Sequence, residues 1–288
     1  MPILKVIVLA IVQGLAELLP VSSSAHVIVA EKLMGLDPAS PPMTLLLVML
    51  HTGTMFAVIV YFWQRWHATY FKDLPAFRRF AALVVLATVL TAVIGEAIIK
   101  IIEKTVLVGV PHAQIEDLFS HLEFIAPALA AAGVLIVFAG ILERRKREVI
   151  HATEDMSARQ AGLIGAIQGL CLPFRGFSRS GATISVGMLA GVTKTRAESF
   201  SFALAVVLTP PVVVRELLRV LKAQKIDATL DLGSAIWPSL LGAVFAFFAG
   251  LIALKWLSRW LEKGRWHLFG IYCLVAAAAV AALHSMGY

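Results

Sequence analysis

The feature that most constrains this chain is an apolar segment, broken in its middle by polar residues, that occurs twice. Residues 163–192 read LIGAIQGLCLPFRGFSRSGATISVGMLAGV, and residues 7–36 read IVLAIVQGLAELLPVSSSAHVIVAEKLMGL. A shift of 155 positions places Gln13 on Gln168, so the two segments look like copies of one unit. Each half of each segment has about 12 to 14 residues, whereas a membrane-spanning helix needs about 20. We therefore predict that both segments enter a membrane and return without crossing it.

The rest of the chain contains apolar stretches long enough to cross a membrane. Of the 288 residues, 59% are hydrophobic and only 15% are charged, which is typical of a protein with several spans. A cleaved signal peptide is disfavoured, because Glu17 interrupts the first apolar stretch and the same layout recurs in mid-chain. We predict an all-α polytopic membrane protein with two re-entrant helical hairpins and six transmembrane helices. The candidate spans are residues 42–64, 80–101, 120–142, 197–220, 234–257 and 266–286.

The order along the chain is one hairpin, three spans, a second hairpin and three further spans. Because a hairpin returns to the side from which it entered, each half of the chain crosses the membrane an odd number of times. The second half is therefore expected to lie upside down relative to the first, as an inverted-topology repeat whose hairpin tips meet near the midplane. We predict a single integral membrane domain, residues 1–288, with repeat 1 at 1–143 (re-entrant 3–36) and repeat 2 at 157–288 (re-entrant 160–193).

Lysines and arginines are distributed unevenly between the two predicted faces. Fifteen lie on the face that carries loops 65–79, 143–160, 194–196 and 255–265, and seven lie on the other face, with three arginines inside the membrane left out. The positive-inside tendency predicts that the first face is cytoplasmic and that both termini are extracytoplasmic. Because the basic residues fall in short clusters, the net charge of +7 is a topology signal and no nucleic-acid partner is expected.

Three further features bear on the architecture. Pro210 and Pro211 lie inside the fourth span and are expected to kink or break that helix. Residues 66–80 combine aromatic and basic residues, which predicts an interfacial stretch or loop. Cys171 and Cys273 both lie within apolar segments, which argues against a disulfide framework or a cysteine-based metal site.

Polar and ionisable residues gather at the break of the first hairpin. Gln13 and Glu17 are four residues apart and share a helix face. Pro20 ends this leg, and a serine at 22–24 can cap the following helix, whose first turns carry His26. An ionisable side chain in the middle of a membrane costs about 2.5–3.5 kcal/mol even on the insertion scale. A binding or catalytic role is therefore favoured for Glu17 over a purely structural one.

The break of the second hairpin carries positive charge. Arg175 and Arg179 lie close together in the sequence, and Ser178, Ser180 and Thr183 open the following helix. Guanidinium groups and the free backbone N–H groups at a helix start suit a phosphate. Together, the two breaks offer an anion-binding site, a nucleophile and an acid or base.

Simpler structural roles compete with some of these assignments. Hydroxyls in membrane helices usually cap a helix or bond to backbone carbonyls, which is the simpler role for Ser22 and Ser24. Arg175 is equally suited to reach the membrane interface or to pair with a carboxylate. His51 is read as a packing or supporting residue.

Two motifs resemble those of a known family. Residues 20–26, PVSSSAH, follow Gln13 and Glu17, and residues 176–183 read GFSRSGAT. Together, on this hydropathy background, they resemble the two signature motifs of the bacterial undecaprenyl-pyrophosphate phosphatase family, also known for bacitracin resistance. The resemblance extends over most of the chain. It departs from the family pattern at Gln13, where an acidic residue is usual, and at Arg175, where a proline usually precedes the glycine.

The resemblance implies removal of the terminal phosphate of a C55 polyprenyl pyrophosphate lipid in the bacterial cytoplasmic (inner) membrane. This reaction regenerates the lipid carrier for peptidoglycan precursors and uses a divalent cation, Mg²⁺ or Ca²⁺. By motif, Glu17 is implied as acid/base or metal ligand, Arg179 as the pyrophosphate ligand, and Ser23 and His26 as the nucleophile candidates. The candidates for substrate binding are Gln13, Ser22, Ser178, Ser180, Thr183 and Arg175.

A different function is compatible with the same architecture. Many secondary transporters are built from inverted repeats with broken helices, and a fold does not by itself decide function. Transport or flipping of a phosphorylated polyprenyl lipid is therefore the alternative. The sequence leaves open which residue is the nucleophile, which cation is bound, which isoprenoid length is preferred, and whether the protein forms a homodimer.

Overall fold

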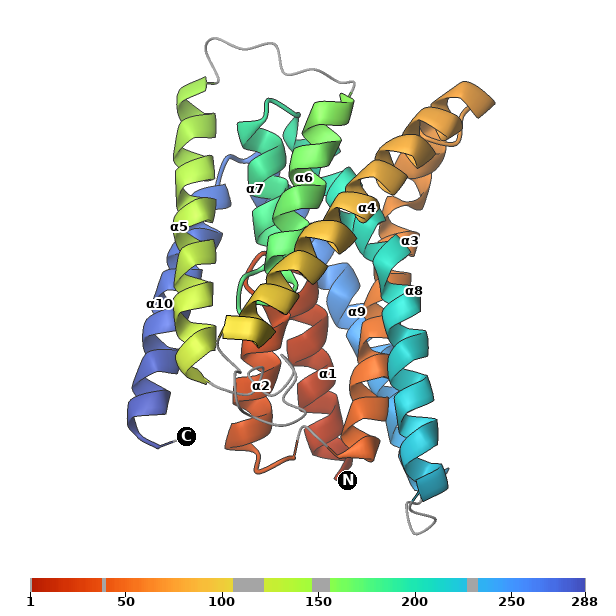
Figure 1. Ribbon diagram of the computed structural model, residues 1–288, viewed down its shortest axis with the longest axis vertical. Coiled ribbons are helices and arrows are strands. Elements are labelled where there is room, and N and C mark those ends of the chain that lie inside the picture. Colours follow the sequence, from red (N-terminus) through yellow and green to blue (C-terminus); the bar gives the residue numbers. More distant parts are fainter. Residues whose placement is uncertain (1, 38–39, 106–121, 147–155, 227–232, 288) are drawn as a thin grey trace.

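The computed structural model describes residues 2–37, 40–105, 122–146, 156–226 and 233–287, and these form ten α-helices (Figure 1). Six helices of the described residues are long and apolar enough to cross a membrane, which confirms the predicted number of spans. These six are α3, α4, α5, α8, α9 and α10. The helices are α1 Ile3–Leu18, α2 Ser23–Leu33, α3 Pro41–Thr69, α4 Leu74–Thr105, α5 Leu122–Lys146, α6 Ala158–Cys171, α7 Arg179–Leu189, α8 Lys194–Ile226, α9 Gly233–Glu262 and α10 Trp266–Ser285.

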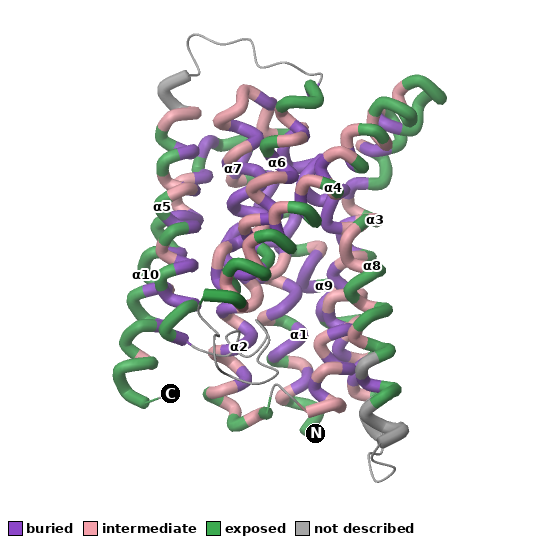
Figure 2. Tube along the Cα trace, viewed as in Figure 1, coloured by how far each residue is buried: buried purple, intermediate pink, exposed green. Residues whose placement is uncertain are grey.

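Large apolar side chains lie on the outside of the bundle as well as in its core. Val85 of α4, Ile252 of α9 and Val275 of α10 are each at least 60% exposed, whereas Phe62 and Leu129 are fully buried. Figure 2 shows the same division, with exposed positions along the outer helices and buried positions in the centre. Such an apolar exterior requires lipid rather than water around it. The protein is a multi-span membrane protein.

The four remaining helices form two hairpins, α1–α2 and α6–α7. They have 16, 11, 14 and 11 residues, so the longest extends about 24 Å, less than the ~30 Å of a hydrocarbon core. In Figure 1 the hairpins lie at opposite ends of the bundle and point toward each other, with their tips in its middle. The tips are in contact, since the Gly176 N–H donates to Ser24 Oγ at 3.3 Å and Ser180 Oγ donates to the Leu19 carbonyl at 3.3 Å.

Local sequence explains where the helices of these hairpins begin and end. Leu19 precedes Pro20 and has ψ 151°, an extended conformation that the ring of a following proline favours, so α1 ends there. In the second hairpin, α6 begins with a capping box between Ser157 and Gln160. The hydroxyl of Ser178 accepts the Gly181 N–H and caps α7.

Two sequence expectations are corrected by the helices. Residues 66–80 are not an interfacial loop, because α3 continues to Thr69 and α4 begins at Leu74. Only a short turn separates them, and Asp73 ends it by accepting the Ala76 N–H at 2.7 Å. The aromatic and basic residues at 66–80 therefore lie at the end of α3, in the short turn and at the start of α4.

The second correction concerns the two prolines of the fourth span. The helix α8 runs unbroken through Pro210 and Pro211 from Lys194 to Ile226. In an apolar environment a break would leave further backbone groups without hydrogen-bond partners, so the helix continues despite the two N–H groups that proline lacks. Residues 120–121 of the predicted third span and residues 147–155 of the loop 143–160 lie outside the described part of the chain.

Candidate active site

The carboxylate of Glu17 is the centre of the polar cluster between the hairpin tips. Its side chain is only 13% exposed. Arg179, the first residue of α7, places Nη2 at 2.5 Å from Oε1, and Ser23, the first residue of α2, donates its hydroxyl to Oε2 at 2.5 Å. Three helices from both hairpins thus supply an acid, a hydroxyl and a guanidinium in direct contact. Of the groups expected at the two breaks, the carboxylate, one hydroxyl and one guanidinium are in contact.

Two further residues contact the same carboxylate oxygen. Gln13, one turn earlier on α1, donates its amide to Glu17 Oε2 at 3.2 Å. His51 of α3 places Nε2 at 3.7 Å from Oε2, while its Nδ1 lies 2.8 Å from the carbonyl of Leu47. A carbonyl only accepts, so Nδ1 carries the proton in the neutral ring and Nε2 presents its lone pair. His51, for which the sequence favours a packing or supporting role, lies against the central carboxylate.

His26 belongs to a separate network on the neighbouring turn of α2. Its Nδ1 lies 2.8 Å from the Ser22 carbonyl, which again fixes the proton on Nδ1 of the neutral ring. Its Nε2 lies 2.7 Å from the Tyr272 hydroxyl, and the two rings stack with centroids 5.6 Å apart. In the described part of the chain no hydrogen bond joins His26 to Ser23 or Glu17. The two nucleophile candidates therefore have different partners.

Sequence reasoning missed Tyr272. This tyrosine lies in α10, in the last apolar span, 246 positions from His26. No spacing rule connects residues so far apart, and only the packing of α10 beside the first hairpin tip brings them together. An aromatic residue with a polar end inside an apolar span was the only available signal.

The backbone at both tips adopts unusual conformations. Ser22 has φ 68°, which is rare for a residue other than glycine and marks a position held by its surroundings. This conformation accompanies the contact of the Ser22 carbonyl with His26. At the other tip Gly176 has φ 101°, and a Cβ there would come 2.6 Å from the carbonyl oxygen of Ile125. A glycine is therefore required where the second tip meets α5.

Several residues predicted to bind substrate are engaged within the protein. Ser178 caps α7, Ser180 donates to the first hairpin, and Thr183 is fully buried with its hydroxyl 2.6 Å from Ser201 Oγ. The Ser22 hydroxyl lies 3.2 Å from Ser24 Oγ. Arg175 is exposed on the turn between α6 and α7, and its charge acts on a buried carboxylate of α2. That carboxylate belongs to Glu31, which is 1% exposed.

Comparison with known proteins identifies the family. The sequence pattern described as Bacitracin resistance protein BacA matches residues 6–279, nearly the whole chain. The chain belongs to the BacA family. It is 57% identical to undecaprenyl-diphosphatase 2 of Acinetobacter baylyi over 286 residues, which cover 98% of each chain. It is 32% identical to the undecaprenyl-diphosphatase of Rhodopirellula baltica over 282 residues, again 98% of each chain. With that of Desulfosudis oleivorans it shares 33% identity over 280 residues, covering 93% of this chain and 94% of the relative.

The site of this BacA-family chain offers few ligands for a metal ion. Among the described residues there is no group of three or more His, Cys, Asp and Glu side chains that could hold one. Among the described residues, Glu17 is the only carboxylate in contact with Ser23 and Arg179, and Gln13 contacts it through its side-chain amide. Hard divalent cations are often held by one or two carboxylates together with phosphate oxygens of a substrate. Glu17 and Gln13 can therefore hold a divalent cation only when the phosphate oxygens of a bound substrate complete its coordination.

The cluster has the parts that phosphoryl transfer requires. The Ser23 hydroxyl is hydrogen-bonded to a carboxylate that can take its proton, and Arg179 supplies a planar cation. Helices α2 and α7 both begin at the site, so their free N–H groups and positive dipole ends favour a negative ligand there. In this BacA-family protein the site can hold a phosphate group beside an activated hydroxyl.

Proposed function

We propose that the protein hydrolyses undecaprenyl pyrophosphate to undecaprenyl phosphate and inorganic phosphate. It thereby recycles the lipid carrier for peptidoglycan synthesis and confers bacitracin resistance. The observation that carries this proposal is the Glu17 carboxylate held at 2.5 Å from both the Ser23 hydroxyl and the Arg179 guanidinium. Membership of the BacA family and the undecaprenyl-diphosphatases named above, 57% identical in one case, support the same activity.

Arg179 changes partner when the substrate binds. Without substrate it pairs with Glu17, and a pyrophosphate, which carries more charge than one carboxylate, competes for the guanidinium. Transfer of Arg179 to the pyrophosphate releases Glu17 Oε1 and leaves the carboxylate free to accept a proton. Substrate binding and activation of the base are therefore coupled through one side chain.

Ser23 is the nucleophile of the proposed reaction. Its Oγ attacks the terminal phosphorus while its proton passes to Glu17. The bond from that phosphorus to the bridging oxygen breaks, and the electron pair leaves with undecaprenyl phosphate. Water then attacks the phosphoserine, Oγ leaves and recovers the proton from Glu17, and both hydrogens of the water depart with inorganic phosphate. His26 remains the other candidate, and its Nε2 would first have to part from the Tyr272 hydroxyl.

The other residues assigned to substrate binding contribute to the site in different ways. Gln13 holds Glu17 from one side and Arg175 gives a second positive charge for the pyrophosphate. Ser22 shapes the first tip. Three hydroxyls of the second tip orient the start of α7 so that the N–H groups of this helix face the phosphate. These hydroxyls are those of Ser178, Ser180 and Thr183.

The reaction would use a divalent cation, Mg²⁺ or Ca²⁺. Glu17 would hold it together with oxygens of the pyrophosphate, since the described residues form no group of three or more metal-ligating side chains. When bound, it would neutralise charge that develops on the phosphoryl oxygens.

The two halves of the chain, 1–143 and 157–288 of a single membrane domain, form an inverted repeat with two re-entrant hairpins. Equivalent glycines support this. A Cβ on Gly14 of α1 would lie 2.7 Å from the carbonyl oxygen of Ala246 in α9, and a Cβ on Gly169 of α6 would lie 2.8 Å from that of Thr91 in α4. Both the glycines and their partners are related by the same shift of 155 positions, so each hairpin packs against the other half in the same way.

The protein resides in the bacterial inner membrane with both termini outside the cytoplasm. The excess of basic residues on the face opposite the termini supports this orientation. Hairpin α1–α2 then opens toward the extracytoplasmic side and α6–α7 toward the cytoplasm.

The test is phosphate release by the purified protein from undecaprenyl pyrophosphate, with and without divalent cation. We expect release that depends on the cation. A parallel measurement in vesicles follows movement of a phosphorylated polyprenyl lipid, the alternative function. Transport without release of phosphate from any isoprenoid pyrophosphate would overturn the proposal.

A further inference from the structure

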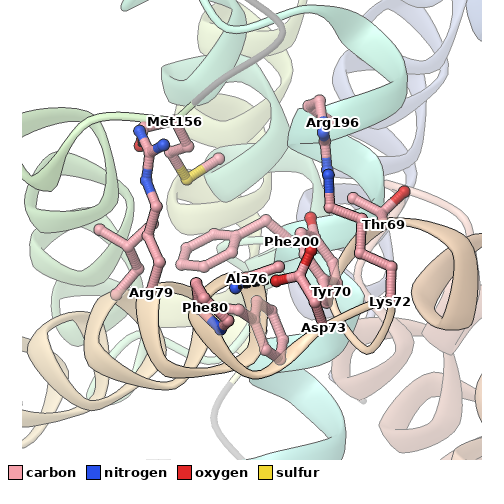
Figure 3. Close-up of a pocket in the computed structure, with 12 residues that line it drawn as sticks. Thr69, Tyr70, Lys72, Asp73, Ala76, Arg79, Phe80, Met156, Arg196 and Phe200 are labelled. Atoms are coloured by element: carbon pink, nitrogen blue, oxygen red, sulfur yellow. Dashed lines mark hydrogen bonds between the residues drawn. The ribbon is translucent and has the colours of Figure 1, made fainter.

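A cavity of about 350 Å³ lies far from the hairpin tips, at the corner between α3 and α4 (Figure 3). The start of α8 closes one side, and the corner lies at the end of the bundle opposite both chain termini (Figure 1). Its volume is at the lower end of the roughly 300–1,000 Å³ typical of ligand pockets. The side chains that the argument uses are Tyr70, Lys72, Arg79, Phe80, Arg196 and Phe200.

The rim of this corner cavity is positively charged. Lys72, Arg79 and Arg196 line it together with one acid, Asp73. Asp73 is occupied in capping α4, where it accepts the Ala76 N–H at 2.7 Å. Among the described residues, no ion pair involves Lys72 or Arg196. The cavity therefore has an excess of positive charge.

Aromatic rings form the inner wall of the cavity. Tyr70 and Phe80 stack with centroids 4.0 Å apart, and Phe80 meets Phe200 edge to face at 6.4 Å. The guanidinium of Arg196 lies over the Tyr70 ring at 5.4 Å, which holds this cation at the cavity without neutralising it. The wall is buried, since Phe200 is 1% and Tyr70 9% exposed. The cavity is thus a packed feature of the fold.

An apolar path leads from the cavity along α4 into the membrane. Leu83 lines the cavity, and α4 carries no charged residue between Arg79 and Glu96. Val85, Val89 and Val93 in this stretch are more than half exposed, and Figure 2 shows exposed positions recurring along α4. A ligand with a charged head and an apolar tail matches both features at once. A basic pocket at the end of membrane helices is a setting in which anionic lipid head groups bind.

We propose that the corner cavity binds the phosphate-bearing head group of an anionic lipid from the leaflet on that face. The phosphate is held by Lys72 and Arg196, the glyceryl part lies against the aromatic wall, and the acyl chains follow α4. Because this face carries most of the basic loops, the leaflet is the cytoplasmic one. The site is separate from the Glu17 cluster and does not depend on the proposed reaction.

The test compares two double variants by native mass spectrometry of the full-length protein in detergent. Lys72→Ala with Arg196→Gln removes both cations from the cavity. Lys255→Ala with Arg259→Gln makes the same change in charge on α9, at exposed positions outside the lining. Each protein is titrated with phosphatidylglycerol, with phosphatidylcholine, and with phosphatidylglycerol in the presence of inorganic phosphate at a comparable concentration. The melting temperature and the size-exclusion elution volume of each variant, measured without added lipid, check that both are folded.

We expect wild type and the α9 variant to bind phosphatidylglycerol equally and the cavity variant to bind it about 10- to 30-fold more weakly, from about 1 kcal/mol per cation. Phosphatidylcholine should bind no better to wild type than to the cavity variant. Equal phosphatidylglycerol affinity in the two double variants would overturn the proposal. Displacement of the lipid by inorganic phosphate at comparable concentration would also overturn it, because the cavity would then recognise free phosphate rather than a lipid.

Discussion

At the residue scale, the site depends on one carboxylate with several partners. Glu17 contacts Ser23, Arg179, Gln13 and His51, which come from four different helices. An unpaired carboxylate would be costly inside a membrane, and the hydrogen bonds from Ser23 and Gln13 and the ion pair with Arg179 stabilise it in place. The same contacts place a hydroxyl and a guanidinium on either side of it.

The sequence could predict only part of this cluster. The pairing of Gln13 with Glu17 followed from helical spacing, and the positions of Ser23 and Arg179 near it followed from motifs beside the two breaks. His51 and Tyr272 could not be placed, because each lies on a separate span whose rotation about its axis is set by packing. Periodicity gives the apolar content of such spans but not the side that faces a distant hairpin.

The identity of the nucleophile is testable through the trapped intermediate. Substrate labelled on its terminal phosphorus, quenched during turnover, should leave the label on wild-type protein and on the His26→Ala variant, but not on Ser23→Ala. The reason is that, among the described residues, Ser23 is the one whose hydroxyl is bonded to the Glu17 carboxylate. Phosphoserine survives acid and is lost in alkali. An acid-labile label that persists in Ser23→Ala and disappears in His26→Ala would assign the step to histidine.

The hydroxyl of Tyr272 is expected to contribute to activity through His26. Tyr272→Phe keeps the ring stacking and removes one hydrogen bond, whose net contribution is about 0.5–1.5 kcal/mol, so kcat/KM should fall roughly two- to tenfold. Tyr61→Phe is the matched control, because it removes a tyrosine bond to Ser258 Oγ elsewhere. Steady-state phosphate release measures both. Equal activity of the two variants would mean that the hydrogen bond between Tyr272 and His26 does not affect the reaction.

At the scale of elements, the hairpins are fixed by close backbone approach. A Cβ on Gly165 of α6 would come 2.3 Å from the Ala87 carbonyl oxygen in α4, and that backbone cannot move aside easily. Small residues at such crossings allow membrane helices to pack closely. The position of each tip, and hence of Glu17 and Arg179, follows from these contacts.

Alanine substitutions at Gly165 and at Gly162 of α6 should lower the stability of the protein by different amounts. Gly165→Ala is expected to destabilise the protein by about 1–3 kcal/mol through overpacking. Gly162→Ala, one turn earlier, meets only the flexible end of Leu90 at 3.3 Å and should be nearly neutral. Melting temperatures from fluorescence-detected size exclusion measure the difference. Similar melting temperatures for the two variants would mean that α6 does not pack tightly on α4.

Element boundaries were less predictable than element number. Hydropathy located the six spans because each needs a long apolar stretch. It misjudged residues 66–80, since aromatic and basic residues also occur at the ends of helices that extend beyond the hydrocarbon core. A pair of prolines is likewise a weaker signal of a helix break in lipid. A broken helix would leave more backbone groups without hydrogen bonds than the two N–H groups that the prolines lack.

At the scale of the whole molecule, the orientation of the bundle is testable. Figure 1 places both termini at one end and the α3–α4 corner at the other. In an active background without Cys171 and Cys273, Lys72→Cys should react with an impermeant maleimide only from the cytoplasm. Met286→Cys, at a position 72% exposed, should react only from outside. Labelling of both cysteine variants from the same side would contradict the fold. Labelling of Lys72→Cys from outside and of Met286→Cys from the cytoplasm would mean that the orientation is reversed.

The central claim is that two hairpin tips assemble one pyrophosphatase site inside the membrane. Its most direct test is phosphate release from undecaprenyl pyrophosphate by wild type, Glu17→Gln and Arg179→Ala, with Glu143→Gln as a control that removes a carboxylate paired with Lys194. We predict that the first two variants, one at each tip, lose about 10²–10⁴-fold in rate while remaining folded, and that the control retains wild-type activity. Wild-type rates in either tip variant would contradict the account.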